Sequence, residues 1–285
     1  MSGDPGLFGP QSITWQVHAD PVMGLAGLRA LFLQALHPLA MAGVAQHSDF
    51  RTDPWGRLFR TAEFVGVSSF GTVEEAERAA AKVRGVHRKL SGIEPETGTP
   101  YRVDDPELLR WVHCCEVDSF LGTYRRCGGR LTDAESDRYL FEQRETARLV
   151  GLAPDTVPSS LAEMADYFER MRPQLRAGGE ANRAARFVLV PPMPRAVSVA
   201  TPARPAWVGV AGLGFAMLPR WARKLYRLPG VAPTDIGATV AGRALRTALM
   251  RLPEGVRTGP HVKAARARLA QEPAPNRRLR AVNDS

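Results

Sequence analysis

Four of the six histidines lie between residues 37 and 113, interspersed with arginines in largely apolar sequence. A neutral imidazole is a common ligand for iron, and an arginine beside it pairs with carboxylate groups. Histidines clustered in such surroundings favour a buried cofactor over an accident of packing. The other two, His18 and His261, are predicted to lie on the surface.

The segment from 73 to 90 has the clearest pattern. Helical spacing places Ala76, Ala80 and His87 on one stripe, which is apolar apart from the histidine. The alanines would let a flat group approach the helix closely, and Arg84, one turn before His87, could reach an anionic group beside it. A haem iron with its two propionates needs this combination. From periodicity alone, a core histidine bonded to a backbone carbonyl is the simpler interpretation.

A second histidine lies on the helix expected from 106 to 127. The apolar residues at helical spacing around His113 predict that its side chain points inward. Glu116 and Asp118 flank this stripe, and either carboxylate could accept a hydrogen bond from an imidazole and so fix the tautomer of a ligand. A solvated carboxylate is the simpler interpretation of Glu116, whereas for Asp118 the two interpretations are balanced.

A third group consists of Arg57, Arg60 and Thr61. If this segment is helical, the three residues lie on one face, because spacings of three and four residues bring side chains together. Fixed guanidinium donors and a hydroxyl beside a bound oxygen species would stabilise negative charge that develops on oxygen. An exposed basic face is the alternative.

His37 and His47, with Asp49 or Asp53, offer a different metal chemistry. Two histidines and one carboxylate that face a single point form the usual non-haem iron site. Spacing along the sequence does not show whether these side chains converge, so this alternative stays open.

Helix signals follow one another along most of the chain. Thr72 and Thr132 each begin a capping box, Asp105 precedes a proline at a first helical position, and Pro38 ends the first long helix. The predicted helices span residues 22–36, 73–90, 106–127, 133–151, 160–171, 206–226 and 235–252. No alternation of apolar and polar residues is long enough to predict a sheet.

Composition agrees with an all-α fold, which we expect to be a single domain of roughly ten helices. With 285 residues and 44% apolar content, the chain can bury a sizeable core, which we place at about residues 10–252, with a flexible tail at 272–285. Only four of the 38 basic residues are lysine, so an arginine-rich codon bias accounts for much of the net charge of +9. Because no basic helix or aromatic platform accompanies this charge, no specific nucleic-acid partner is expected.

The three cysteines form no Cys-x-x-Cys pair and are predicted to be buried thiols of a reducing compartment. No signal peptide and no apolar span of about 20 residues is visible, so a cytoplasmic location is expected. The segment Arg220–Arg227 mixes cations with aromatic side chains and could rest on a membrane surface as a peripheral contact. A buried helix with a solvated basic end is the simpler interpretation. A monomer and a homodimer both remain open.

Several short motifs occur together in a recognisable order. They are Leu33-Gln34-x-x-His37-Pro38, His47-Ser48, Asp53-Pro54, Val83-Arg84-x-x-His87, Trp111-Val112-His113 and Asp118-Ser119-Phe120. With them, the chain resembles the MpaB/latex-clearing-protein family over about residues 10–252. The resemblance implies an all-helical, distantly globin-like fold with a buried haem pocket.

The resemblance also implies roles for individual residues. His87 would be the iron ligand of a b-type haem, and Arg84 would pair with a propionate. The candidate residues are therefore His87 as metal ligand, Arg84, His113 and Asp118 around the cofactor, and Arg57, Arg60 and Thr61 as catalytic residues.

Characterised members of the family cleave carbon–carbon double bonds of isoprenoid chains with dioxygen. Rubber-cleaving members have a lysine where this chain has Arg60, and an Arg-His pair where it has Ser91-Gly92. We therefore expect a haem-dependent oxygenase that acts with dioxygen on a smaller apolar substrate, either isoprenoid-like or aromatic. A haem peroxidase or peroxygenase, a non-catalytic haem-binding protein and a membrane-surface protein are the alternatives.

Overall fold

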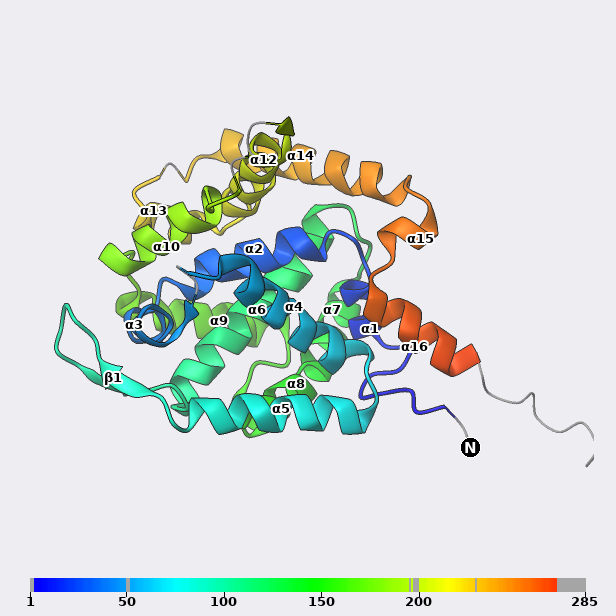
Figure 1. Cartoon of the computed structure of the whole chain (residues 1–285), viewed down its shortest axis with the longest axis horizontal. Helices are drawn as coiled ribbons and strands as arrows, with labels where there is room; N and C mark the ends of the chain where they lie inside the picture. The colour runs from blue at the N-terminus through cyan, green and yellow to red at the C-terminus, as the bar shows by residue number, and fades with distance from the viewer. Residues whose placement is uncertain (1–2, 50–51, 195, 197–199, 229, 271–285) are drawn as a thin grey trace, which may run out of the picture.

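Two helices at the centre of the molecule organise the others. The computed structural model describes residues 3–49, 52–194, 196, 200–228 and 230–270. Within it, α2 (Met23–Gln34) makes its most extensive contacts with α6 (Pro106–Arg126), and the remaining helices surround this pair (Figure 1). The all-α class is confirmed, with more helices than the roughly ten expected. A likeness to globins stays a prediction.

The surrounding elements follow the chain in order. They are α1 (Ile13–His18), α3 (Pro38–His47), α4 (Pro54–Phe70), α5 (Val73–His87), β1 (Ser91–Ile93), β2 (Pro100–Arg102), α7 (Asp133–Glu142), α8 (Arg144–Val150), α9 (Leu161–Met171), α10 (Gly179–Leu189), α12 (Ala203–Ala216), α13 (Arg220–Leu225), α14 (Ala232–Met250), α15 (Glu254–Arg257) and α16 (Pro260–Ala270).

Local sequence signals set the starts of the main helices. The capping boxes at Thr72 and Thr132 are both formed in full, since each threonine side chain accepts a backbone N–H and the following glutamate bonds back to the cap. Asp105 caps α6 and Ser160 caps α9, each through a side-chain oxygen that accepts a backbone N–H. The predictions for these four starts are confirmed.

Two predicted helices are divided in the structure. The single helix expected over 133–151 breaks at Gln143, whose buried amide donates a hydrogen bond to Thr14 Oγ1 at 2.9 Å and accepts one from Thr146. The helix expected over 206–226 is divided into α12 and α13, with Pro219 at the break. Because proline has no backbone N–H, it cannot form the hydrogen bond to the preceding turn that would continue the helix.

The structure contains a short hairpin that the sequence did not predict. Strands β1 and β2 pair antiparallel over three residues each, too few for an alternation to be recognised. Gln46 on α3 attaches the hairpin to the body, because its amide nitrogen donates to the Ile93 carbonyl at 2.8 Å and its amide oxygen accepts from Tyr101 at 2.8 Å.

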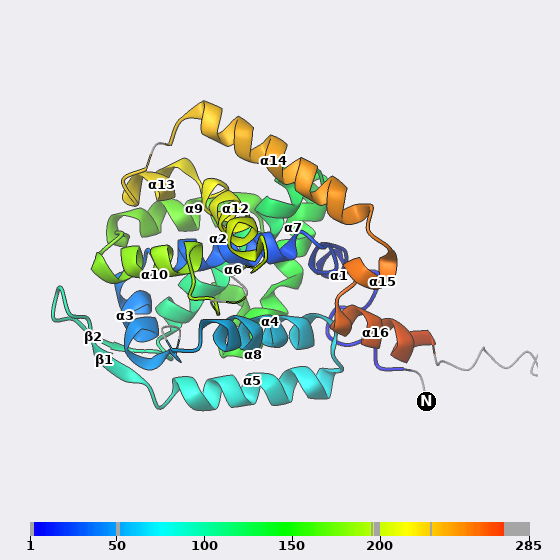
Figure 2. The same cartoon turned by 45° about the horizontal axis from the view of Figure 1, so that its top comes forward.

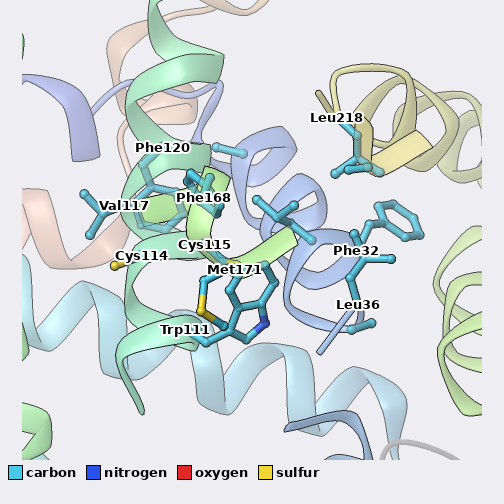
Figure 3. Packing of buried hydrophobic residues seen from close by; sticks show 14 of the residues in the cluster. Phe32, Leu36, Trp111, Cys114, Cys115, Val117, Phe120, Phe168, Met171 and Leu218 are labelled. Atoms are coloured by element: carbon cyan, nitrogen blue, oxygen red, sulfur yellow. The ribbon is translucent and has the colours of Figure 1, made fainter. Parts of the chain in front are cut away.

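The main core lies around α6. Figure 3 shows side chains from α2, α6, α9 and the end of α12 pointing into one cluster. Trp111 lies at its middle, fully buried, and its indole nitrogen donates to the Gln34 carbonyl at 2.9 Å. All three cysteines are buried free thiols, as predicted.

In the described part of the chain no single helix is long and apolar enough to cross a bilayer. The bent pair α2 and α3, which meet at 107°, has the length and composition to do so together. The tail predicted over 272–285 lies outside the described residues.

A buried arginine fixes the last part of the fold. Arg223 is 1% exposed and donates to the Leu218 carbonyl at 3.0 Å and to Asp235 at 2.5 Å, so it joins α13 to the end of α12 and to α14. Arg220, which is 56% exposed, pairs with the same carboxylate from outside.

The two arginines give a matched test. Arg223→Met leaves the half-buried Asp235 carboxylate with Arg220 alone and removes the donor of the carbonyls at the end of α12. It should lower the unfolding free energy by about 3 kcal/mol in urea titrations. Arg220→Met makes the same change in charge at an exposed site and should cost less than about 1 kcal/mol. Equal losses in the two variants would contradict a structural role for the buried guanidinium.

Candidate functional site

His87 lies at the last residue of α5. Its Nδ1 atom is buried and has no hydrogen-bond partner in the described part of the chain. Burial lowers the pKa of the imidazole below its ordinary value, and the nearby Asp104 carboxylate opposes this only in part. The ring is therefore neutral at physiological pH. A buried polar atom without a partner is unusual in a native fold and calls for an explanation.

Arg84, one turn before His87, has a structural partner. Its guanidinium donates to the Leu149 carbonyl of α8, and its side-chain carbons lie beside Gly151, where a Cβ would be 3.5 Å from Arg84 Cδ. Arg84 therefore attaches α5 to the end of α8, with several of its N–H groups unused. Pairing with a propionate stays a prediction.

The segment that contains Arg57, Arg60 and Thr61 is helical and lies in the first half of α4. This is the condition under which the three residues share one face of a helix. Arg57 is half-buried and donates through Nε to Ser48, and burial lowers the pKa of its guanidinium. Arg60 is exposed and pairs with Asp53 at 3.0 Å. Thr61 is exposed, and its hydroxyl donates to the Arg57 carbonyl at 3.0 Å. The three side chains do not converge on one point.

The part of α4 just beyond Arg57 and Leu58 is open to solvent. Five consecutive residues, 59–63, are exposed, which is more than one helical turn. In Figure 1, α4 and α5 meet at Gly71 and separate toward the end of α5 that carries His87. Figure 2 shows the start of α4 lying below α10 and α12. Trp55 attaches it there, with its ring 4.7 Å from that of Trp207.

His113 points inward from α6, as predicted. Its residue is 8% exposed, and burial lowers the pKa of the imidazole to about 4. No hydrogen bond from a described residue reaches either ring nitrogen. The side chain is therefore a neutral imidazole enclosed in the helical body.

Asp118 has a different partner from the one proposed for it. Its carboxylate pairs with the buried Arg29 of α2 at 2.7 Å, and the same guanidinium donates to Ser119 at 2.7 Å and to the Met217 carbonyl at 3.1 Å. The structure thus places Asp118 in a link between α2 and α6, and gives it no contact with an imidazole. A partner 89 residues away is invisible to the local pattern.

Glu116, for which a solvated carboxylate was the simpler interpretation, is half-buried on α6. Burial raises the pKa of its carboxyl to about 7, and no described residue donates a hydrogen bond to it. It lies three residues after His113, so the two side chains share one side of α6. This spacing from the inward-pointing His113 is the feature of the sequence that could have predicted a partly enclosed Glu116.

His18 is not a surface residue. Its ring nitrogens lie 2.6 Å from Ser69 Oγ and 2.9 Å from the Tyr139 hydroxyl, and its edge packs on Phe120. Burial lowers the pKa of this imidazole to about 3. The side chain thus joins α1 to α4 and α7. His261, by contrast, is partly exposed and its Nε2 lies 2.9 Å from a Glu63 oxygen.

Three of the four residues considered for non-haem iron have separate structural roles. His37 caps α3, His47 lies 3.1 Å from the Ser91 carbonyl, and Asp53 caps α4. Within the described residues, no group of three or more histidine, cysteine, aspartate or glutamate side chains could hold a metal ion. Neither His37 nor His47 is therefore part of such a donor set there.

The segment proposed for membrane contact is largely engaged in the fold. Arg220 and Arg223 both pair with Asp235, as described above. Lys224 and Arg227 are exposed, and no described residue pairs with their side chains. Contact with a membrane stays a prediction that rests on these two cations.

Glutamine at position 116 tests the buried carboxyl. Because the folded state raises its pKa from 4.5 to about 7, the proton it holds stabilises the fold at low pH, and this contribution is lost as pH rises through about 7. Glu116→Gln cannot ionise, so its stability relative to the parent should improve by on the order of 2 kcal/mol between about pH 5 and about pH 8.5. Urea unfolding of the variant and the parent at both pH values measures this change. If the difference between their unfolding free energies is the same at both pH values, the carboxyl does not have a raised pKa in the folded state.

Comparison with known proteins adds the family. The sequence profile described as ER-bound oxygenase mpaB/B'/Rubber oxygenase, catalytic domain, matches residues 15–252. No curated protein and no solved structure matches the chain. The matched region extends from within α1 to the loop after α14 and contains every candidate residue discussed above. The chain therefore belongs to the MpaB/rubber oxygenase catalytic-domain family.

Proposed function

We propose that this protein is an oxygenase that uses a b-type haem and dioxygen to oxidise a small apolar substrate, isoprenoid-like or aromatic. The family supplies the oxygenase class. The observation that carries the haem proposal is the buried, unpartnered Nδ1 atom of the neutral His87 ring. An iron-bound imidazole uses one nitrogen for the metal and offers the other to a neighbour, often through water.

The partners of the other histidines support this choice. His18, His37, His47 and His261 each have a contact within the described fold that accounts for a ring nitrogen. His87 and His113 have none. A haem needs one side chain as its axial ligand, so this donor set fits a haem better than a metal held by several side chains.

The residues around His87 would divide the work of holding the group. His87 would bind the iron, and the unused N–H groups of Arg84 would pair with a propionate. When bound, the haem supplies the iron at which dioxygen is activated. On α4, the guanidinium of Arg57 offers N–H donors to an oxygen species, whereas the hydroxyl of Thr61 already donates to the Arg57 carbonyl. The exposed stretch 59–63 of α4 leaves room for a ligand.

Two residues of α6 differ in their protonation near neutral pH. Glu116, with a pKa of about 7, takes up or releases a proton near neutral pH, whereas the imidazole of His113 stays neutral. A carboxyl with such a pKa is suited to general acid–base work. We assign Glu116 the role of holding a proton inside the helical body.

Exposed apolar side chains on α4 and α5 offer surface to an apolar substrate. Phe59 on α4 is 68% exposed and Val86, adjacent to His87, is 50% exposed. Large apolar side chains that stay open to solvent beside polar ones are usual at small-molecule sites. This supports an apolar substrate over a charged one.

His87→Ala tests the proposal. Removing the axial ligand should lower the haem content of the purified protein at least about tenfold, because the remaining contacts provide no bond to iron. Helical content, measured by circular dichroism, should be unchanged, since the residue lies at the end of α5. His47→Ala removes an exposed histidine and should keep the parental haem content. An unchanged haem spectrum in His87→Ala would refute the assignment.

A further inference from the structure

A pocket of about 410 Å³ lies apart from the proposed haem site. It is formed by the N-terminal segment and by the corner between α7 and α8, and none of the residues assigned to haem or dioxygen lines it. Its volume falls within the range of about 300–1,000 Å³ that is typical of small-molecule sites. The walls include the apolar side chains of Leu7, Phe8 and Pro154.

One arginine in this pocket forms no hydrogen bond or ion pair with a described carboxylate. Arg144 makes no ion pair or hydrogen bond with another described side chain, and its Nε atom is buried without a partner. Its guanidinium lies over Phe141, 5.5 Å from the ring centroid. That ring is itself 60% exposed. A guanidinium held over an aromatic ring has less freedom to lose when it binds an anion.

The carboxylates that line the pocket are already engaged. Glu142 accepts hydrogen bonds from the Thr14 amide at 2.8 Å and from Arg138 at 3.1 Å. Glu145 accepts one from Arg148 at 2.9 Å. Neither glutamate bonds to Arg144. The carboxylate that feels its charge is Glu163 of α9, whose pKa Arg144 helps to lower and which does not line the pocket.

The break at Gln143 explains why these groups meet. The buried amide of Gln143 is held by Thr14 and Thr146, so the helix ends there and a new one starts at Arg144. This corner presents Phe141 and Arg144 together toward the N-terminal segment. The geometry is set by contacts on the inner side of the corner and leaves its outer side free for a ligand.

We propose that this pocket binds a small organic monocarboxylate with an aromatic or branched aliphatic body. Arg144 would hold the carboxylate through parallel N–H groups, and Phe141, Phe8 and Leu7 would contact the apolar body. Glu142 and Glu145 lie beside the charge and disfavour dianions such as phosphate esters, since a second negative charge would face them without compensation. The site is distinct from the proposed oxygenase site and does not depend on it.

Calorimetric titration of the full chain with three probes tests the proposal. Naphthoate, naphthyl phosphate and naphthylmethanol share one aromatic body and differ in charge. We expect naphthoate to bind once per chain, at least about tenfold more tightly than either of the others. Arg144→Gln should weaken naphthoate binding at least about tenfold.

Two further variants complete the design. Arg170→Gln makes the same charge change at an exposed arginine of α9 outside the pocket, and should leave the affinity within about twofold. Phe141→Ala truncates an exposed ring, so it should fold normally and weaken binding about fivefold or more. The proposal is overturned if wild type binds no naphthoate below about 1 mM. It is also overturned if Arg144→Gln and Arg170→Gln have equal effects, or if naphthyl phosphate binds as tightly as naphthoate.

Discussion

The buried guanidinium of Arg29 is the contact on which the arrangement of the central helices depends. It is 5% exposed and bonds to Asp118 and Ser119 of α6 and to a carbonyl at the end of α12. A buried arginine is costly unless its donors are satisfied. Only one register of α2 on α6 brings these acceptors together, so the contact selects that register. The same register holds His113 and Glu116 inside the helical body.

The candidate site lies at the edge of this scaffold. α5, which carries His87, meets α4 and α8 and has no extensive contact with α2. It is held by Ala76 and Ala80, which pack on Leu149, and by the bond from Arg84 to the Leu149 carbonyl. Packing therefore fixes α5 on the side that faces α8. The exposed stretch 59–63 of α4 is open to solvent. A rigid scaffold with an open side suits a site that must admit a cofactor and an apolar molecule.

Local patterns predicted the parts of the fold that depend on neighbouring residues. The capping boxes at Thr72 and Thr132 specify helix starts within four residues, and the stripe on α6 correctly turned His113 inward. Partners distant in sequence could not be predicted in this way. The pairing of Asp118 with Arg29 and the bonding of His18 to Tyr139 join separate elements, and no spacing rule indicates them.

The two carboxylates of α6 show why local spacing did not predict the partners of the site residues. Glu116 and Asp118 are two residues apart on one helix, yet the first is left without a donor and the second is paired. Their difference arises from what the surrounding helices present to each carboxylate. The sequence therefore indicated the helices that carry the candidate residues, whereas the partner of each side chain required the assembled fold.

The central claim is that His87 holds a b-type haem, and an absorption spectrum tests it most directly. The purified full-length chain, reconstituted with haemin, is examined for a Soret band, and a pyridine haemochrome assay gives the haem content. We expect close to one b-type haem per chain, with a spectrum that changes when dioxygen meets the reduced protein. A chain that remains colourless after reconstitution would show that it holds no haem.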